Sequence, residues 1–347
     1  MVRIGMLAPI THPYPPLGYG PWERVTHDLT ERLVLDGHDV TLFAPAGSET
    51  KAELIETADA PLVSTPWIDR RAAEDLHVET AMTVAGDGAF DIVHSHLHIH
   101  ALPFADQIPC PLLTTLHGAA WAPAHHDLLR RHSDLPFVSL SDRERAFLPE
   151  LNYVATIPNG IRVEEFPPGD GSGGYVAFVG RISPEKAPHL AVEVARRSGR
   201  HLLMAGIIED QYRRYARDCL LSTGEFVDFL GPLDRPELSL LLRDATALLM
   251  PLQWDEPFGL VVVESLASGT PVIAWRRGAM PEIIDDGVTG FIVDDVASAV
   301  EALSRVDDLS RAGCARVARA RFDDATMAAA YANVYGRVVS SGPSRSF

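Results

Sequence analysis

Residues 256–264 read Glu-Pro-Phe-Gly-Leu-Val-Val-Val-Glu and are the segment best suited to chemistry. They follow an apolar run that predicts a strand ending near Met250, and they open a predicted helix. A helix N-terminus binds anions through its free N–H groups, and Gly259 allows close approach to the backbone. Along a helix, Glu256 and Glu264 would be about 12 Å apart. That spacing suits a nucleotide sugar, with hexose near the first carboxylate, diphosphate at the helix tip and ribose near the second. Two solvated glutamates on a helix face are the alternative.

Residues 180–187 (Gly-Arg-Ile-Ser-Pro-Glu-Lys-Ala) carry the matching positive charge. They follow the first predicted strand of the second half of the chain, and a predicted helix comes next. Arg181 and Lys186 bracket the turn between them, and Lys186 is one of two lysines in the chain. Two such cations can neutralise a diphosphate, because each charge-assisted hydrogen bond contributes about 1.5–3 kcal/mol. An exposed basic turn is the alternative.

Short apolar runs alternate with helical patterns along the whole chain, which predicts two parallel α/β sheets. Trp22–Leu35 has apolar residues at helical spacing, and Gly37 ends this predicted helix. Ligands bind such sheets at the carboxyl ends of the strands, so we expect the site in a cleft between two doubly wound domains. The strands that we predict are 2–7, 40–44, 91–94, 112–116, 137–140, 154–157, 175–179, 202–205, 227–230, 247–250 and 272–274.

Turn-forming residues dominate 166–174, and we place a domain linker there. The sequence thus predicts an N-terminal domain over residues 1–168 and a C-terminal domain over 175–321. Residues 340–347 are polar, and we expect them to be a flexible tail.

The chain has 347 residues, 46% of them hydrophobic, and a formal net charge of −17. This composition indicates a globular protein and disfavours nucleic-acid binding, because an acidic surface repels phosphate backbones. No apolar stretch approaches the length of a membrane span, and no leader peptide is recognisable, so we expect a cytoplasmic protein without integral membrane association. The three cysteines have neither metal nor redox spacing, so we interpret them as free thiols.

The pairing of residues 180–186 with two glutamates separated by seven residues resembles glycosyltransferase family four, the retaining GT-B enzymes. The resemblance covers almost the whole chain and is most specific in its second half. Further segments that match in the same order are 157–161, 230–233, 269–274, 278–284 and 286–291.

The resemblance implies a role for each matching position of the second domain. Arg181 and Lys186 would bind the donor diphosphate, and Glu264 would bind the ribose. Glu256 would hold the transferred sugar, helped by the backbone of three residues that follow it. Those three residues are Phe258, Gly259 and Leu260, and Leu233 would lie against the base. A helix over residues 322–339 would cross back onto the first domain.

In the first domain the resemblance points to His117, which follows a predicted strand and would reach the donor sugar near the reacting carbon. A histidine bonded to a nearby backbone carbonyl is the alternative. Gly18 and Gly20 resemble the glycine loop of the family and would face the diphosphate, although a tyrosine separates them. The candidates for contact with the acceptor are Tyr19, Trp121 and His125, and plain loop surface is the alternative for the last two.

Histidines also occupy positions 94, 96, 98 and 100, an alternation that would place all four on one face of a strand. We interpret them as structural or cleft-lining, and we expect neither a metal nor another cofactor. A nicotinamide enzyme is disfavoured because the glycine loop lacks the third glycine of the dinucleotide fingerprint.

Together these features predict a retaining, metal-independent hexosyltransferase that uses a nucleotide sugar, with UDP favoured by family frequency and GDP next. The first 165 residues carry most of the negative charge, which favours a soluble small-molecule or saccharide acceptor. Retention by a covalent intermediate and by same-face attack both remain open, and the resemblance favours same-face attack. The alternatives are a nucleotide-sugar epimerase on the same fold and a non-catalytic nucleotide-sugar binding protein.

Overall fold

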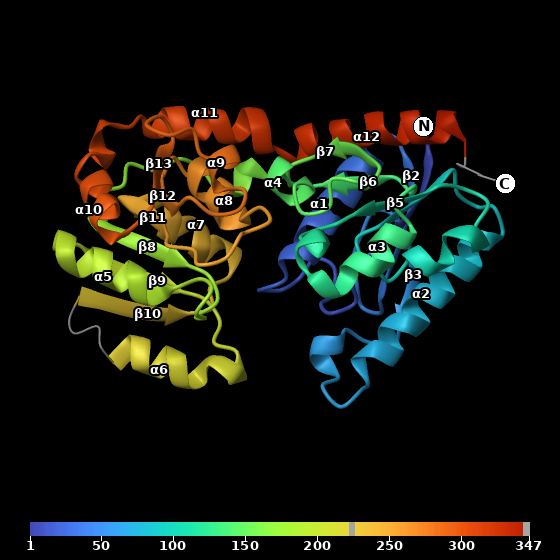
Figure 1. The fold of residues 1–347 in the computed structure, drawn as a ribbon, viewed down its shortest axis with the longest axis horizontal. Coiled ribbons are helices and arrows are strands. Elements are labelled where there is room, and N and C mark those ends of the chain that lie inside the picture. The colour runs from blue at the N-terminus through green and yellow to red at the C-terminus, as the bar shows by residue number, and fades with distance from the viewer. Residues whose placement is uncertain (222–225, 343–347) are drawn as a thin grey trace. The chain divides into compact units, whose positions relative to one another are not determined.

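The computed structural model describes residues 1–221 and 226–342. The chain forms two compact units (Figure 1). The first comprises Met1–Gly160 together with the segment that begins at Asp324, and the second comprises Ile161–Asp323. None of the helices in the described ranges is long and apolar enough to cross a membrane. All three cysteines are buried free thiols.

The described part of the first unit contains a seven-stranded parallel sheet in the order β3-β2-β1-β4-β5-β6-β7. Because all strands are parallel and β1, β4 and β5 are adjacent, the loops that follow these three strands lie next to one another at one edge of the sheet. The strands are β1 (Arg3–Leu7), β2 (Asp39–Pro45), β3 (Glu53–Ala58), β4 (Ile92–Ser95), β5 (Leu112–Thr115), β6 (Phe137–Ser139) and β7 (Tyr153–Thr156).

The described part of the second unit contains a six-stranded parallel sheet in the order β10-β9-β8-β11-β12-β13. Here β8 and β11 are neighbours, so the loops after them are adjacent although they are far apart in sequence. The strands are β8 (Tyr175–Val179), β9 (His201–Ala205), β10 (Val227–Gly231), β11 (Ala247–Met250), β12 (Val272–Trp275) and β13 (Gly290–Val293).

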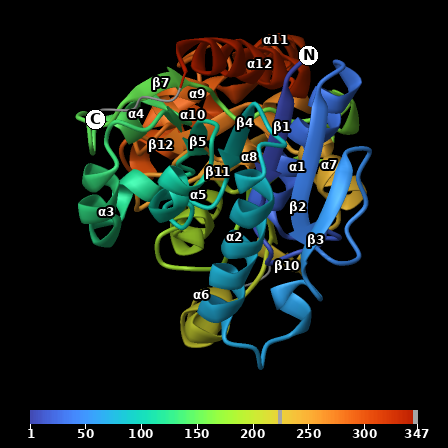
Figure 2. The same ribbon diagram turned by 90° about the vertical axis from the view of Figure 1, so that its right-hand side faces the viewer.

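Every predicted strand is present, and the predicted fold of two doubly wound parallel sheets is confirmed. The two strands that the sequence analysis missed, β3 and β13, are the outer strands of their sheets, as Figure 2 shows for β3 beside β2. β3 reads Glu-Leu-Ile-Glu-Thr-Ala, is mostly half-exposed and lacks the apolar run of a central strand. β13 is four residues long and begins with a glycine.

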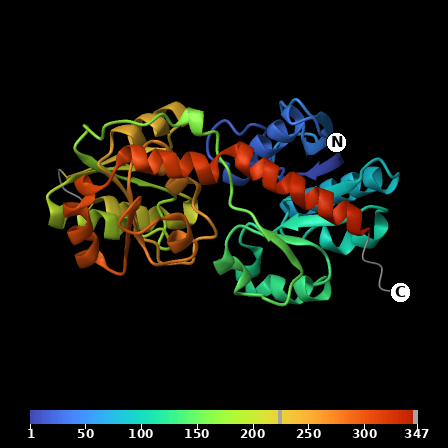
Figure 3. The ribbon, with the colours of Figure 1, turned by 90° about the horizontal axis from the view of Figure 1, so that it is seen from above.

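Helices flank the strands in both units. α1 begins at Pro21 and packs against α12, which brings the C-terminal segment back onto the first unit (Figure 3). The helices of the first unit are α1 (Pro21–Leu35), α2 (Arg70–Gly86), α3 (His126–Arg131), α4 (Asp142–Arg145) and α12 (Asp324–Ser341). Those of the second unit are α5 (Pro188–Ser198), α6 (Arg213–Leu221), α7 (Arg235–Asp244), α8 (Leu260–Ala267), α9 (Met280–Ile283), α10 (Val296–Ser304) and α11 (Arg311–Phe322).

The segment that we interpreted as a linker belongs to the second unit, because the units divide after Gly160. Gly169 donates a hydrogen bond to the Ser268 carbonyl, and the Arg311 guanidinium donates to the Gly169 carbonyl. Its turn formers therefore make a coil that packs against that unit. The predicted flexible tail begins too early, because α12 continues to Ser341. Residues 343–347 of that tail lie outside the described ranges.

Candidate active site

The second unit brings the charged candidates together at the carboxyl ends of β8 and β11. Arg181 lies two residues after β8, and residues 251–259 form the loop between β11 and α8. Lys186 precedes α5, whose N-cap residue Ala187 has a left-handed backbone with φ of 51°. The two predicted segments thus meet because their strands are paired neighbours.

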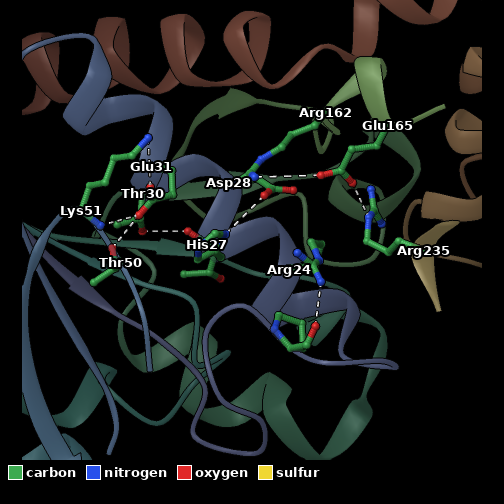
Figure 4. Close-up of polar contacts among 12 residues, drawn as sticks. Arg24, His27, Asp28, Thr30, Glu31, Thr50, Lys51, Arg162, Glu165 and Arg235 are labelled. Atoms are coloured by element: carbon green, nitrogen blue, oxygen red, sulfur yellow. Dashed lines mark hydrogen bonds and ion pairs between the residues drawn. The ribbon is translucent and has the colours of Figure 1, made fainter. Parts of the chain in front are cut away.

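Lys186 forms an ion pair with Glu256. Both side chains are largely buried, with 14% and 11% of their surfaces exposed. The Lys186 ammonium also lies 5.1 Å from the centre of the Trp254 ring, a favourable cation–π distance. The other lysine, Lys51, is far more exposed and pairs with Glu31 in the first unit (Figure 4).

Arg181 is held by two carboxylates, 3.4 Å from Glu185 and 3.2 Å from Glu209. Hydrogen bonds from Gln211 and Arg181 lower the pKa of Glu209, so that carboxylate is ionised at neutral pH. The cluster therefore contains two cations and three carboxylates. A diphosphate must compete with these carboxylates for the cations, so the cations alone are not a preformed anion site.

The loop that carries Glu256 corrects one expectation. α8 begins only at Leu260, with Gly259 as its N-cap residue at φ of 93°. Glu256 therefore lies outside the helix, and the estimate of about 12 Å along a helix does not apply to it. Instead, the loop is bound by a second turn: Gly278 donates to the Asp255 carboxylate at 2.8 Å, and Ala279 donates to the Glu256 carbonyl at 2.9 Å.

Glu264 lies on α8 and is almost fully buried, with 8% of its side chain exposed. Its carboxylate accepts a hydrogen bond from Arg235 at 3.0 Å. Arg235 also pairs with Glu165 (Figure 4). Its guanidinium lies over the ring of Phe166. Arg235 was not predicted as a site residue, although it stands only two residues beyond the candidate Leu233, which is half-buried.

The remaining candidates of the second unit differ in what they can offer. Phe258 is buried and packs edge-on against Phe322, with ring centroids 5.9 Å apart. Its side chain therefore belongs to the core, which leaves its backbone for a ligand. Leu260 is the first residue of α8, where backbone N–H groups have no helical partner.

In the first unit, His117 lies two residues after β5 and is 3% exposed. Its backbone is left-handed, with φ of 48°, which is uncommon for a residue other than glycine and is often found at functional sites. Burial lowers the pKa of His117 well below 6.5, so its imidazole is neutral at physiological pH. Nε2 of His117 lies 2.8 Å from Nδ1 of His96, a contact between ring nitrogens where the sequence analysis weighed one to a carbonyl.

The glycine loop shows that its two glycines are not equivalent. A Cβ on Gly20 would lie 2.8 Å from Cβ of Pro16, whereas a Cβ on Gly18 would meet open space. Gly20 is also the N-cap residue of α1. Tyr19 is about half exposed. Trp22, which we did not predict as a site residue, is 42% exposed. Its ring lies edge-on to that of His98, with ring centroids 4.4 Å apart.

Trp121 and His125, the other acceptor candidates, are half-buried and contact neighbouring residues of the first unit. The Trp121 ring packs against Phe147 at 5.3 Å between centroids, and Nδ1 of His125 contacts the Ala119 carbonyl at 3.2 Å. Local packing therefore accounts for much of their surface.

The expectation that four alternating histidines share one strand face is wrong. β4 ends at Ser95, so only His94 belongs to the strand, and His98 has a left-handed backbone with φ of 53°. His100 is exposed, in contrast to the buried His94 and His96. Within the described residues, no group of three or more histidine, cysteine or carboxylate side chains is arranged to hold a metal ion.

Comparison with known families matches nearly the whole chain. Residues 22–165 match the family described as Glycosyltransferase Family 4, and residues 165–320 match Glycosyl transferases group 1. A glycogen synthase of Mycobacterium tuberculosis is 30% identical to this chain, and the alignment covers 93% of this chain and 92% of the synthase. A phosphatidyl-myo-inositol mannosyltransferase of Mycolicibacterium smegmatis is 28% identical and covers 98% of this chain and 95% of its own.

Solved structures show the same fold at lower identity. Sucrose-phosphate synthase from Thermosynechococcus elongatus superposes with a TM-score of 0.81 at 19% identity, covering 99% of this chain and 100% of its own. HepE of Anabaena, solved with UDP and glucose, superposes with a TM-score of 0.75 at 18% identity, covering 97% of this chain and 100% of its own.

Proposed function

Because this chain belongs to glycosyltransferase family 4, we propose that it transfers a sugar with retention from a nucleoside-diphosphate sugar to an acceptor hydroxyl. The observation that carries this proposal is the pairing of Lys186 with Glu256 between the ends of β8 and β11. An ammonium suits a diphosphate, and a carboxylate accepts hydrogen bonds from sugar hydroxyls. Donor binding separates the pair and gives each side chain its own part of the ligand.

The donor is a UDP-sugar in this proposal. Support comes from HepE of Anabaena, which has the same fold and has been solved with UDP and with UDP-glucose. Glu264 would accept hydrogen bonds from the ribose, with Arg235 orienting its carboxylate, and Leu233 would lie against the base. The acceptor is a saccharide or another small polyol, in line with relatives named as a glycogen synthase and a D-inositol 3-phosphate glycosyltransferase.

The chemistry breaks the bond between the anomeric carbon and the diphosphate and forms a bond to the acceptor oxygen. Arg181, Lys186 and the N-terminus of α8 stabilise the growing charge of the leaving diphosphate. In same-face attack, the acceptor proton passes to the departing phosphate oxygen. His117 positions the sugar, because a neutral imidazole with a strongly lowered pKa is a poor general base at physiological pH. These cations do the work of a metal ion, so EDTA should leave turnover unchanged.

Thermal unfolding with millimolar UDP, GDP, ADP, dTDP and NAD tests the donor site. A ligand at 100 times its Kd adds about 2.7 kcal/mol, which raises Tm by a few degrees. We expect UDP to give the largest shift and Arg181→Ala to abolish it. Turnover of UDP-glucose with saccharide acceptors, analysed for the anomer formed, then tests the transfer. A shift with NAD alone, or epimerised nucleotide sugar formed without acceptor, would contradict the proposal.

A further inference from the structure

Two buried histidines of the first unit share a hydrogen bond at the edge of its sheet. His96 follows β4 directly, His117 lies two residues beyond β5, and these strands are paired. The 2.8 Å contact joins Nδ1 of His96 to Nε2 of His117. The two residues are 1% and 3% exposed. Burial lowers the pKa of each well below 6.5, so the bond joins two neutral rings.

A bond between two neutral imidazoles holds one hydrogen, which couples the tautomers of the rings. If His96 donates, Nε2 of His117 accepts and Nδ1 of His117 carries a hydrogen. If His117 donates, its Nδ1 is a bare acceptor. The tautomers of the two rings therefore change together: the position of the shared hydrogen decides whether His117 presents a donor or an acceptor at Nδ1, and Nε2 of His96 has no hydrogen-bond partner among the described residues.

The other nitrogen of His117, Nδ1, is unsatisfied within the described ranges. Nδ1 of His117 is buried and has no hydrogen-bond partner among the residues that the structure describes. A buried polar atom without a hydrogen bond destabilises the protein, so a ligand hydroxyl that bonds to it would recover that free energy. The nitrogen is thus available for a substrate, while the partnered nitrogen holds the ring.

His96 is itself supported from behind. Its ring lies against that of His94, with centroids 4.2 Å apart. His94 is fixed at both nitrogens, by the Tyr335 hydroxyl and the Thr115 hydroxyl, each at 2.8 Å. α12 supplies Tyr335, so the C-terminal helix of the first unit helps to hold this group of side chains.

We propose that His96 is a positioning residue of the transfer reaction, which orients His117 and sets the tautomer that His117 offers to the donor sugar. This inference rests on the proposed function. The backbone supports it, because the left-handed turn at His117 stores strain that surrounding contacts must hold, and Gly118 donates to the Glu144 carboxylate at 2.5 Å. Glu144 thus holds the backbone of the turn, and His96 holds the ring.

Three variants test the role of His96. His96→Leu removes the ring contact, and His96→Asn keeps an amide that can donate or accept near the position of Nδ1. His77→Leu is the matched control, because His77 is 0% exposed and bonded at both nitrogens, to Thr57 at 2.6 Å and to the Ala8 carbonyl at 2.9 Å.

With UDP-glucose as donor, we expect His96→Leu to lower kcat about 100-fold with little change in KM, the effect of a misplaced reacting group. His96→Asn should recover at least about tenfold of that loss, since a single hydrogen bond of about 1.5 kcal/mol corresponds to roughly tenfold. His77→Leu should lower Tm but leave kcat near the wild-type value. Wild-type kcat in folded His96→Leu, or an equal loss of kcat in His77→Leu, would overturn the proposal.

Nitrogen NMR of labelled histidines gives a readout that does not need turnover. We expect scalar coupling between Nδ1 of His96 and Nε2 of His117 in the wild-type protein, and loss of the fixed His117 tautomer in His96→Leu but not in His96→Asn. If the wild-type protein turns over no nucleotide sugar, the proposed function fails, and the tautomer still decides whether His96 fixes His117. An unchanged tautomer in folded His96→Leu would refute that link, and so would the absence of this scalar coupling in the wild-type protein, which needs no variant to fold.

Discussion

The two units place different chemistry at the carboxyl edges of similar sheets. The second unit uses charged side chains that neutralise one another, with Lys186 on Glu256 and Arg181 between Glu185 and Glu209. The first unit uses buried neutral rings, because desolvation lowers the pKa of His117 and its neighbours. One edge is suited to exchanging ion pairs with a charged ligand, and the other to holding a polar group in one orientation.

This difference shows that a similar parallel-sheet topology does not dictate the electrostatics at the edge of the sheet. Ion pairs tolerate partial exposure, as at Arg181, which has 26% of its side chain exposed. A directed bond between neutral rings needs burial, because water would offer each nitrogen other partners. Substitutions at each edge can therefore separate these two kinds of site.

The largest effect should follow from Lys186→Met, which removes the ion pair with Glu256 while keeping an apolar chain of similar length. We expect turnover of UDP-glucose to fall about 100- to 1000-fold, because the leaving group loses a fixed positive charge. Steady-state kinetics give this value directly. Tm should fall as well, because a mostly buried carboxylate is left without its cation.

Two further variants check this interpretation. Lys51→Met removes the other lysine, which pairs with Glu31 on the surface, and should leave turnover unchanged. Lys186→Met combined with Glu256→Gln should restore Tm but not turnover. Recovery of turnover in that double variant would show that Lys186 serves only to balance Glu256.

Gly278→Ala should destabilise the fold through a steric overlap. Gly278 has φ of 54°, and a Cβ there would overlap the backbone nitrogen and oxygen of Glu256. We expect a loss of about 3 kcal/mol or more in the free energy of unfolding, measured by denaturant titration. Gly287→Ala is the matched control, because Gly287 also has positive φ, 74°, but faces open space. It should lose only the strain of about 1 kcal/mol, and equal losses would exclude the steric explanation.

Glu144→Gln tests the buried, uncharged edge of the first unit, where Glu144 holds the turn at Gly118. Burial raises the pKa of Glu144 from 4.5 to about 7, so between these values the folded protein keeps a proton that the unfolded chain has lost. Its stabilising contribution is therefore complete below pH 4.5 and is lost as pH rises toward 7. The stability of Glu144→Gln relative to wild type should rise by about 2–3 kcal/mol from pH 5 to pH 8. Denaturant titrations across this range measure it, and a flat difference would contradict the raised pKa of Glu144.

Much of this arrangement could be predicted, because it depends on local patterns. Apolar runs bounded by turns predicted the central strands, and loops after paired strands predicted that residues 180–187 and 256–264 meet. The outer strand β3 was missed because it is mostly half-exposed and lacks such a run. β13 is buried, but it has only four residues and begins with a glycine. Sequence reasoning therefore located the site through the order of its strands.

The partners of each side chain could not be predicted, because they come from distant segments. Glu209 lies 28 positions from Arg181, and Gly278, which binds the Glu256 loop, comes from a turn after β12. His96 looked like one member of an alternating series until β4 was seen to end before it. The spacing of residues along the chain does not show that His96 bonds to Nε2 of His117 and that Nδ1 lacks a partner among the described residues.

Trp22→Ala should have the smallest effect and sharpens the first unit's side of the comparison. The Trp22 ring is 42% exposed and lies near His98 and His117, with centroid distances of 4.4 and 6.3 Å. A flat apolar ring beside the candidate sugar-positioning histidine can stack on an acceptor, which contributes about 1 kcal/mol. We therefore expect acceptor KM to rise about fivefold while donor KM stays constant. Trp67→Ala, at a tryptophan that is 78% exposed, should change neither value. A rise in donor KM alone would show that Trp22 contacts the donor and not the acceptor.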